Sequence, residues 1–254
     1  MRKITSAIAA AGAAALLFAA PASAAHEGSS YTADLQELND SGASGTATVT
    51  VSEDGETMSV RIQASGLALD GPHAQHIHGI VSGDEVSASA CPTMADAGDD
   101  GVLTVAEGLP SYGDVQVSLT TEGDSTPDSA LAVERFPGGT SIDYSRTGIP
   151  IPDALKPNLG KLHIVVHGID ENGNGMLDMD QEERSSLDES LPREATAPAL
   201  CGTLAAQAQG PVQTGAGGTA EVASDGAART GATVAGIAAV GFAALAFGTR
   251  RRTA

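Results

Sequence analysis

Large aromatic side chains are scarce in this chain of 254 residues: tryptophan is absent, and aromatic residues make up only 3%. A hydrophobic core therefore has to come from valine, isoleucine, leucine and alanine. Basic residues are also few, with 13 lysines and arginines against 32 acidic residues and a net charge of −19. So acidic a chain disfavours nucleic acid and anionic lipid as partners, and favours solubility and cation binding. The sequence also lacks a Gly-x-Ser-x-Gly motif and a phosphate-binding loop, so it shows no complete catalytic set.

The N-terminus has the features of an export signal. Residues 1–24 combine a basic start, an apolar run and small residues before the expected cleavage point after Ala24. This arrangement is typical of a secretory signal peptide, so we expect the remainder to be extracytoplasmic.

The C-terminus predicts attachment to the cell surface. Residues 231–249 are apolar and precede a basic tail at 250–254, which indicates a transmembrane helix with a cytoplasmic tail. The segment Ala227–Gly231 is similar to a sortase sorting signal, so processing to the cell wall is the alternative. Residues 205–230 are rich in glycine and alanine and are expected to form a flexible stalk.

Residues 25–204 are expected to form one all-β domain. Apolar and polar residues alternate with period two in several short segments, and turn signals such as Asp54-Gly55 separate them. No window has the length and period of a long amphipathic helix. This pattern predicts an antiparallel sandwich or barrel. The alternating segments are Thr46–Val51, Thr57–Ala64, Asp114–Leu119 and Thr140–Tyr144.

Five of the six histidines lie in two strand-like segments, His73–Gly79 and Lys161–Gly168. Alternate residues of a strand share a face, so His76 and His78 project side by side. His163 and His167 also share a face but lie about 13 Å apart along the strand, so at most one of them joins the first pair. The sharpest hypothesis from the sequence is therefore a three-histidine metal site of His76, His78 and His167. The alternative is that these histidines form ordinary hydrogen bonds in or beside the sheet.

The two cysteines, Cys91 and Cys201, are far apart in the sequence. In an exported protein such a pair predicts one disulfide. The bridge closes a loop of about 110 residues, which contributes on the order of 4–5 kcal/mol in the loop-entropy model.

Two loops have the spacing of twelve-residue calcium loops, with oxygen ligands at alternate positions and a glycine at the sixth. A structural calcium ion is the expectation for these loops, and ordinary turns are the alternative. The first loop offers Asp96, Asp100 and Glu107, and the second offers Asp170, Asn172, Asn174 and Asp178.

Several segments together resemble the CHRD (chordin-type) domain, especially its secreted bacterial form. They extend over roughly residues 30–204, and the family implies an immunoglobulin-like β-sandwich without an established enzymatic activity. The matching segments are Tyr31–Gly45, Gln75–Gly79, Cys91–Met94, Tyr112–Gly113, Phe136–Gly138, Val166–Asp170 and Pro198–Gly202.

The layout is also distantly similar to Cu,Zn superoxide dismutase. By that resemblance His76, His78 and His167 match copper ligands, and Cys91 with Cys201 matches the disulfide. The stretch between Cys91 and Tyr112 has no histidine, so the bridging and zinc ligands have no counterpart. Pro198 stands where that family has an arginine. Fast superoxide dismutation by that family's mechanism is therefore not expected.

Two function hypotheses follow. The first is a surface-anchored, non-catalytic CHRD protein of a bacterial cell envelope, with structural calcium and a protein or glycan partner that the sequence does not identify. The second is a copper-binding protein or dismutase-like redox enzyme that uses His76, His78 and His167.

Overall fold

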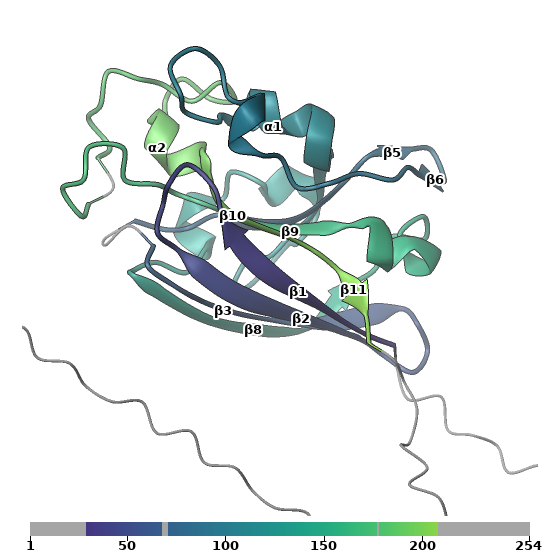
Figure 1. Cartoon of the computed structure of the whole chain (residues 1–254). Helices are drawn as coiled ribbons and strands as arrows, with labels where there is room; N and C mark the ends of the chain where they lie inside the picture. Colours follow the sequence, from purple (N-terminus) through teal and green to yellow (C-terminus); the bar gives the residue numbers. More distant parts are fainter. Residues whose placement is uncertain (1–28, 68–70, 177, 208–254) are drawn as a thin grey trace, which may run out of the picture. The chain divides into compact units, whose positions relative to one another are not determined.

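The computed structural model describes residues 29–67, 71–176 and 178–207, which fall in one compact unit (Figure 1). The fold described thus extends to Gln207, and Ala205 and Ala206, at the start of the expected stalk, form a short strand. The predicted signal peptide at 1–24 and the rest of the stalk lie outside the described residues, as do 231–249 and 250–254.

One curled antiparallel sheet, a half-barrel, dominates the described residues. Eight of its nine strands follow the order β7-β4-β9-β10-β1-β2-β3-β8, and the ninth, β11, pairs with β1 beside this path. The strands are β1 (Ser30–Glu37), β2 (Ser44–Val51), β3 (Thr57–Ser65), β4 (Gln75–Gly79), β7 (Asp114–Ser118), β8 (Ser141–Pro150), β9 (His163–His167), β10 (Pro198–Thr203) and β11 (Ala205–Ala206).

Short elements connect the strands and cover one outer region of the sheet. In Figure 1, α1 and α2 lie on the opposite side of β9 and β10 from β3 and β8. The short elements are a hairpin of β5 (Val81–Ser82) and β6 (Glu85–Val86), the helices α1 (Val105–Tyr112) and α2 (Arg193–Thr196), and the 3-10 turns η1 (Met94–Asp96), η2 (Pro127–Ser129), η3 (Val133–Arg135) and η4 (Lys156–Lys161).

The alternation in the sequence explains which face of the sheet is buried. In β3, Met58, Val60 and Ile62 are at most 1% exposed, whereas Arg61 and Gln63 face solvent. The inward residues of all the long strands join one aliphatic core on the concave face. The strand prediction from period-two alternation is therefore confirmed.

The prediction of an immunoglobulin-like or dismutase-like sandwich is corrected, because the strands form one continuous curled sheet. Strand β1 connects the two halves: its residues Ser30–Leu35 pair with β2, while Gln36 and Glu37 pair with β10. Gly202 lets β10 approach β1 closely, since a Cβ atom there would lie 2.6 Å from the carbonyl oxygen of Asp34. The sheet therefore bends around its core instead of separating into two layers.

The predicted membrane anchor is also corrected. Within the described ranges no helix is long and apolar enough to span a bilayer, and the longer of the two α-helices there, α1, has eight residues. A membrane-spanning helix needs about 20 residues. The segment predicted to span, 231–249, lies outside the described residues. Attachment through a C-terminal helix is therefore not retained.

Strands β4 and β9 are buried on both faces along their whole length, and β10 is buried on both faces up to Gly202. Ile77, Ile164 and Val166 face the concave core. On the outer face, Val165 belongs to a second, smaller cluster with Leu38, Leu103, Tyr112 and Cys201. The segments that carry α1, η2 and α2 thus bury the outer side of β4 and β9, where the histidines lie.

Candidate metal centre

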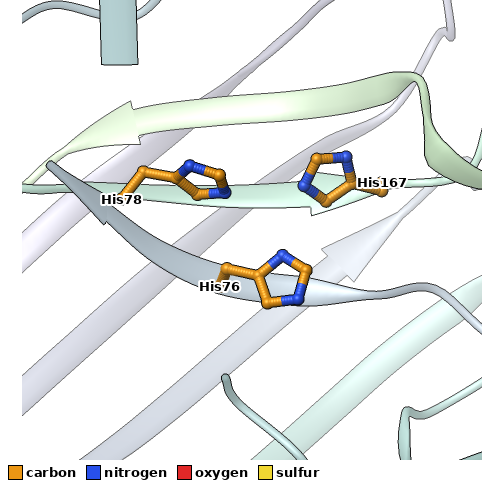
Figure 2. Close-up of side chains that lie close together, drawn as sticks. All are labelled: His76, His78 and His167. Carbon is orange, nitrogen blue, oxygen red and sulfur yellow. The ribbon is translucent and has the colours of Figure 1, made fainter. Parts of the chain in front are cut away.

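Three histidines converge on the outer face of β4 and β9. His76 and His78 are alternate residues of β4, and His167 ends the neighbouring strand β9. The ring centroids lie 5.6 Å apart for His76 and His78, 5.2 Å for His76 and His167, and 5.8 Å for His78 and His167. One ring nitrogen from each lies within 4.8 Å of the others. Figure 2 shows the three rings turned toward one another.

Each of these histidines forms one hydrogen bond to a backbone carbonyl. His76 donates through Nε2 to Ala130 at 3.0 Å, and His78 donates through Nδ1 to Gly113 at 2.9 Å. His167 donates through Nδ1 to Thr196 at 2.6 Å. A carbonyl oxygen only accepts, so the bonded nitrogen of each ring carries the proton. The tautomer of each neutral imidazole is thereby fixed, and its other nitrogen carries a lone pair.

The second ring nitrogens have no hydrogen-bond partner. His76 Nδ1, His78 Nε2 and His167 Nε2 are buried and unpaired, and the three residues are 4%, 1% and 4% exposed. A buried polar atom without a partner costs free energy, and such atoms are rare in native proteins. Three neighbouring imidazoles that each have an unpaired nitrogen are a suitable donor set for a transition-metal ion. Backbone carbonyls that orient the rings are the usual outer support of histidine metal ligands.

Burial keeps these imidazoles neutral, as metal ligands must be. Desolvation, and then the neighbouring His167 and His78, hold the pKa of His76 well below its ordinary value. Desolvation, followed by the charge of His167, lowers the pKa of His78 to about 3. Desolvation also lowers the pKa of His167 to about 4. Protonating any one of them would place an unpaired charge in an apolar region.

The carbonyls that orient the rings belong to residues at or next to the ends of short helices, 54, 35 and 29 residues from the histidines that they contact. Gly113 directly follows α1 with a φ of +80°, and a Cβ atom there would clash with the carbonyl group of Gly79. Only glycine fits this close approach. Ala130 follows η2, and Thr196 is the last residue of α2. Sequence reasoning did not identify these three positions, since a backbone carbonyl has no signature in a motif.

The loop that carries Ala130 is held by a network around Asp124. Its carboxylate accepts from the Thr126 hydroxyl at 2.7 Å and the Ser129 hydroxyl at 2.5 Å. Arg135 donates to the Ser129 hydroxyl at 2.7 Å and to the Asp124 carbonyl at 2.9 Å. These bonds fix the backbone beside the hydrogen-bond acceptor of His76.

The end of β9 is held in a similar way by His73, for which the sequence predicted no role. His73 donates through Nδ1 to the His167 carbonyl at 2.9 Å. A Cβ atom on Gly168, whose φ is +102°, would lie 2.5 Å from that nitrogen. Gly168 therefore lets the His73 ring pack closely against the strand that carries His167.

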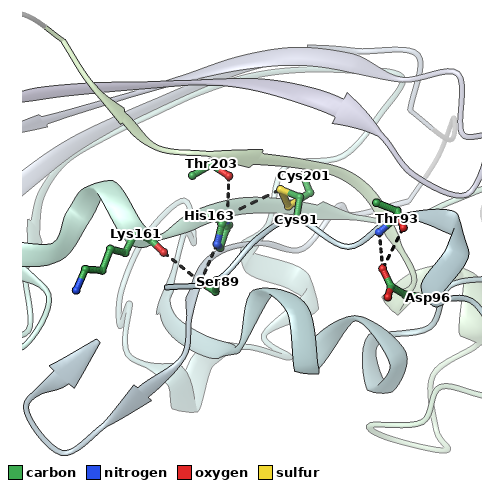
Figure 3. The surroundings of a disulfide bond; sticks show 8 residues. All are labelled: Ser89, Cys91, Thr93, Asp96, Lys161, His163, Cys201 and Thr203. Carbon is green, nitrogen blue, oxygen red and sulfur yellow. Dashed lines mark hydrogen bonds between the residues drawn. A yellow bond between two sulfur atoms is a disulfide. The ribbon is translucent and has the colours of Figure 1, made fainter. Parts of the chain in front are cut away.

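The predicted disulfide between Cys91 and Cys201 is confirmed, with Cα atoms 5.7 Å apart. His163 lies beside it, its Nδ1 3.9 Å from Cys91 Sγ (Figure 3). Ser89 gives its hydroxyl proton to the Lys161 carbonyl, so it accepts from His163 Nε2 at 2.8 Å. His163 Nδ1 then accepts from the Thr203 hydroxyl at 3.0 Å. Both ring nitrogens of His163 are thus engaged, in contrast to those of the three converging histidines.

The acidic residues of the first candidate calcium loop each have another partner. Asp96 accepts from the backbone amide and hydroxyl of Thr93, and Glu107 does the same for Thr104 at the start of α1. Asp100 pairs with Arg193 at 2.6 Å. Among the described residues these three carboxylates do not form a close group.

The second candidate loop brings its side chains closer together. Asn172 and Asn174 both donate to Asp178, at 2.6 and 2.8 Å. Asp170 accepts from the backbone amides of Gly173, Asn174 and Gly175. The buried Glu194 of α2 holds this loop by accepting from the amides of Glu171 and Asp178. In the second loop, two of the candidate side chains thus contact a third, although they do so through amide nitrogens rather than oxygens.

The fold and site define a curled antiparallel β-domain that positions a buried trio of histidines. The CHRD domain model matches residues 28–177, and the chain belongs to the CHRD domain family. That match includes β4, β9 and all three histidines, but not α2 or β10.

Two solved structures resemble the chain at low identity. Superoxide dismutase 5 of Candida albicans, described with Cu(II), is 18% identical, covers 72% of this chain and 95% of its own, and has a TM-score of 0.38. The clock protein EA4 is 15% identical, covers 70% of this chain and 94% of its own, and has a TM-score of 0.35. Comparison with curated proteins gave no match.

Proposed function

We propose that this CHRD domain binds one copper ion through His76 Nδ1, His78 Nε2 and His167 Nε2. The observation that supports the proposal is that these three nitrogens are buried, unprotonated and without a hydrogen-bond partner. A metal ion bound there removes the cost of three unsatisfied acceptors. The hydrogen bonds to Ala130, Gly113 and Thr196 hold the rings in place for it.

Copper is preferred on chemical grounds. Imidazole nitrogens suit copper and zinc, and divalent copper binds a given nitrogen site more tightly than zinc does. The trio includes no carboxylate, which would favour magnesium, calcium or manganese. A second ion is not part of the proposal, because the sequence between Cys91 and Tyr112 has no histidine to bridge two metals.

The proposed role is copper binding or buffering outside the cytoplasm. Copper supplies one-electron chemistry when bound, while the histidines hold the ion and the outer loops exclude bulk water. A disulfide is typical of oxidising compartments, and the signal-peptide pattern of residues 1–24 supports the same location. Rapid superoxide dismutation is not part of the proposed role. Pro198 stands three residues before Cys201, where superoxide dismutases have an arginine that guides the substrate.

Metal analysis of the purified full-length protein tests the proposal. After reconstitution with Cu(II) and removal of loosely bound ion, we expect about one copper per chain. His76→Ala, His78→Ala and His167→Ala should each lose it, whereas His163→Ala should retain it as a matched control on the same strand. Equal loss from His163→Ala, or no copper in the parent protein, would contradict the proposal.

A further inference from the structure

A cavity of about 40 Å³ lies against the three histidines. Its remaining wall is almost entirely aliphatic. Thr196 is the exception, but its hydroxyl donates to Ser185 at 2.8 Å and its carbonyl accepts from His167. The aliphatic wall consists of Ala74, Val105, Val115, Ala130, Leu131 and Leu187.

Two leucines form the solvent side of this cavity. Leu131 is 39% exposed and Leu187 is 49% exposed, although both line the cavity. His76, on the inner side, is 4% exposed. Leu131 lies between η2 and η3, and Leu187 lies in the segment before α2, so the two come from separate loops. A ligand that reaches the histidines from solvent therefore passes aliphatic side chains.

We propose that reduced copper in this site takes one small neutral ligand, of the carbon monoxide or dioxygen class, and that Leu131 and Leu187 form its entrance. This proposal rests on the proposed copper function. Three protein ligands leave a coordination position open, and the cavity lies next to it. A volume of this size exceeds what one water needs, so it has room for a diatomic molecule.

The wall selects against anions. An anion that enters gives up its hydration shell, and the aliphatic wall supplies no hydrogen-bond donor in return. The acidic chain, with its net charge of −19, also repels anions during approach. A neutral diatomic molecule carries neither cost. Cu(I), with a single positive charge, compensates an anion less than Cu(II) does.

Carbon monoxide is the direct probe for this position. The full-length protein is loaded with Cu(I) under anaerobic conditions and titrated with the gas, and binding is followed by the infrared C–O stretch. We expect one carbon monoxide per copper. A protein that retains Cu(I) on the three histidines but binds no carbon monoxide would overturn this inference and leave the copper function intact. A protein that does not hold copper would overturn both.

Two substitutions test the entrance. Leu131→Ala should raise the association rate of carbon monoxide severalfold, while Met94→Ala, at an exposed residue that does not line the cavity, should not. Leu131→Lys places a cation in the wall, and it should tighten azide binding to the Cu(II) form about tenfold. Met94→Lys is the matched control. Unchanged azide affinity in Leu131→Lys, or equal gains in both variants, would refute the assignment of the entrance.

Discussion

His78 and His163 are direct cross-strand partners in β4 and β9, yet only His163 has both ring nitrogens hydrogen-bonded. His78 donates one proton to Gly113 and leaves its other nitrogen unpaired. These two histidines lie on one face of the same sheet but differ in how their ring nitrogens are hydrogen-bonded. One completes a hydrogen-bond network beside the disulfide, and the other retains a lone pair for a ligand.

This difference predicts opposite orders of stability with and without copper. In the metal-free protein, His163→Leu loses two hydrogen bonds and leaves the Thr203 hydroxyl without an acceptor, whereas His78→Leu loses one bond and removes an unsatisfied nitrogen. We expect His163→Leu to cost about 1–3 kcal/mol more free energy of unfolding than His78→Leu. With copper present, His78→Leu should become the less stable variant, because it loses the ligand. Urea denaturation of both variants in both states measures this, and the same order in both states would contradict the assignment.

The buried histidines also predict how the metal-free protein responds to acid. In the folded protein the pKa values of His78 and His167 fall to about 3 and about 4, whereas an unfolded histidine titrates near about 6.5. Between these values the unfolded chain binds more protons than the folded protein does. The contribution of these histidines to the free energy of unfolding is therefore fully present above about pH 6.5 and decreases as the pH falls. Each histidine contributes a slope of up to about 1.4 kcal/mol per pH unit.

Denaturation at several pH values tests this linkage. His78→Leu should reduce the slope of unfolding free energy against pH between about pH 4 and 6 by about 1.4 kcal/mol per unit. An unchanged slope would show that His78 is not held neutral by burial. The low pKa values further imply that copper binding persists below about pH 6, where exposed histidines become protonated.

The disulfide should be a large part of the stability of a domain so poor in aromatic residues. It links residues separated by 110 positions, and Cys201 belongs to the outer cluster with Val165. We expect the double variant Cys91→Ala with Cys201→Ala to lose about 4–5 kcal/mol of unfolding free energy. Chemical denaturation of the oxidised parent and the variant measures the difference. A loss below about 1 kcal/mol would show that the folded core does not depend on the bridge.

Calcium binding remains a prediction, and its test targets the second loop, where Asn172 and Asn174 both contact Asp178. Calcium that binds only the folded protein should add about 1.4 kcal/mol for each tenfold increase above its dissociation constant. Asp178→Asn should abolish this response, because Asp178 is the point at which Asn172 and Asn174 meet. Asp100→Asn breaks the pair with Arg193 and should lower stability without changing the response to calcium. Melting curves in calcium and in chelator provide the measurement, and a response that persists in Asp178→Asn would place the ion elsewhere.

The histidine trio was predictable because it depends on strand periodicity. Period two places His76 and His78 on one face, and the length of the second segment separates His163 from His167. The register alone does not select His167, because His163 lies opposite His78 while the His167 amide bonds to Ala74 at the other end of β4. The disulfide was predictable from the number of cysteines and from the export that residues 1–24 predict.

The curvature of the sheet and the surroundings of the site were not predictable. Alternation shows which residues are buried, but it does not reveal that β1 pairs with β2 along most of its length and with β10 at its end. The hydrogen-bond acceptors that the outer loops supply to the histidines were equally hard to predict. The acceptor for His76 lies 54 residues away and that for His78 lies 35 away, and both are backbone atoms. Contacts of this kind depend on tertiary packing.

The most direct test of the copper assignment is pulsed EPR of the protein loaded with one Cu(II), which counts the imidazole nitrogens coupled to the ion. The structure predicts three coupled imidazoles in the parent protein, two or none in each of His76→Ala, His78→Ala and His167→Ala, and three in His163→Ala. A parent spectrum without imidazole coupling, or one that loses an imidazole when His163 is replaced, would contradict the account.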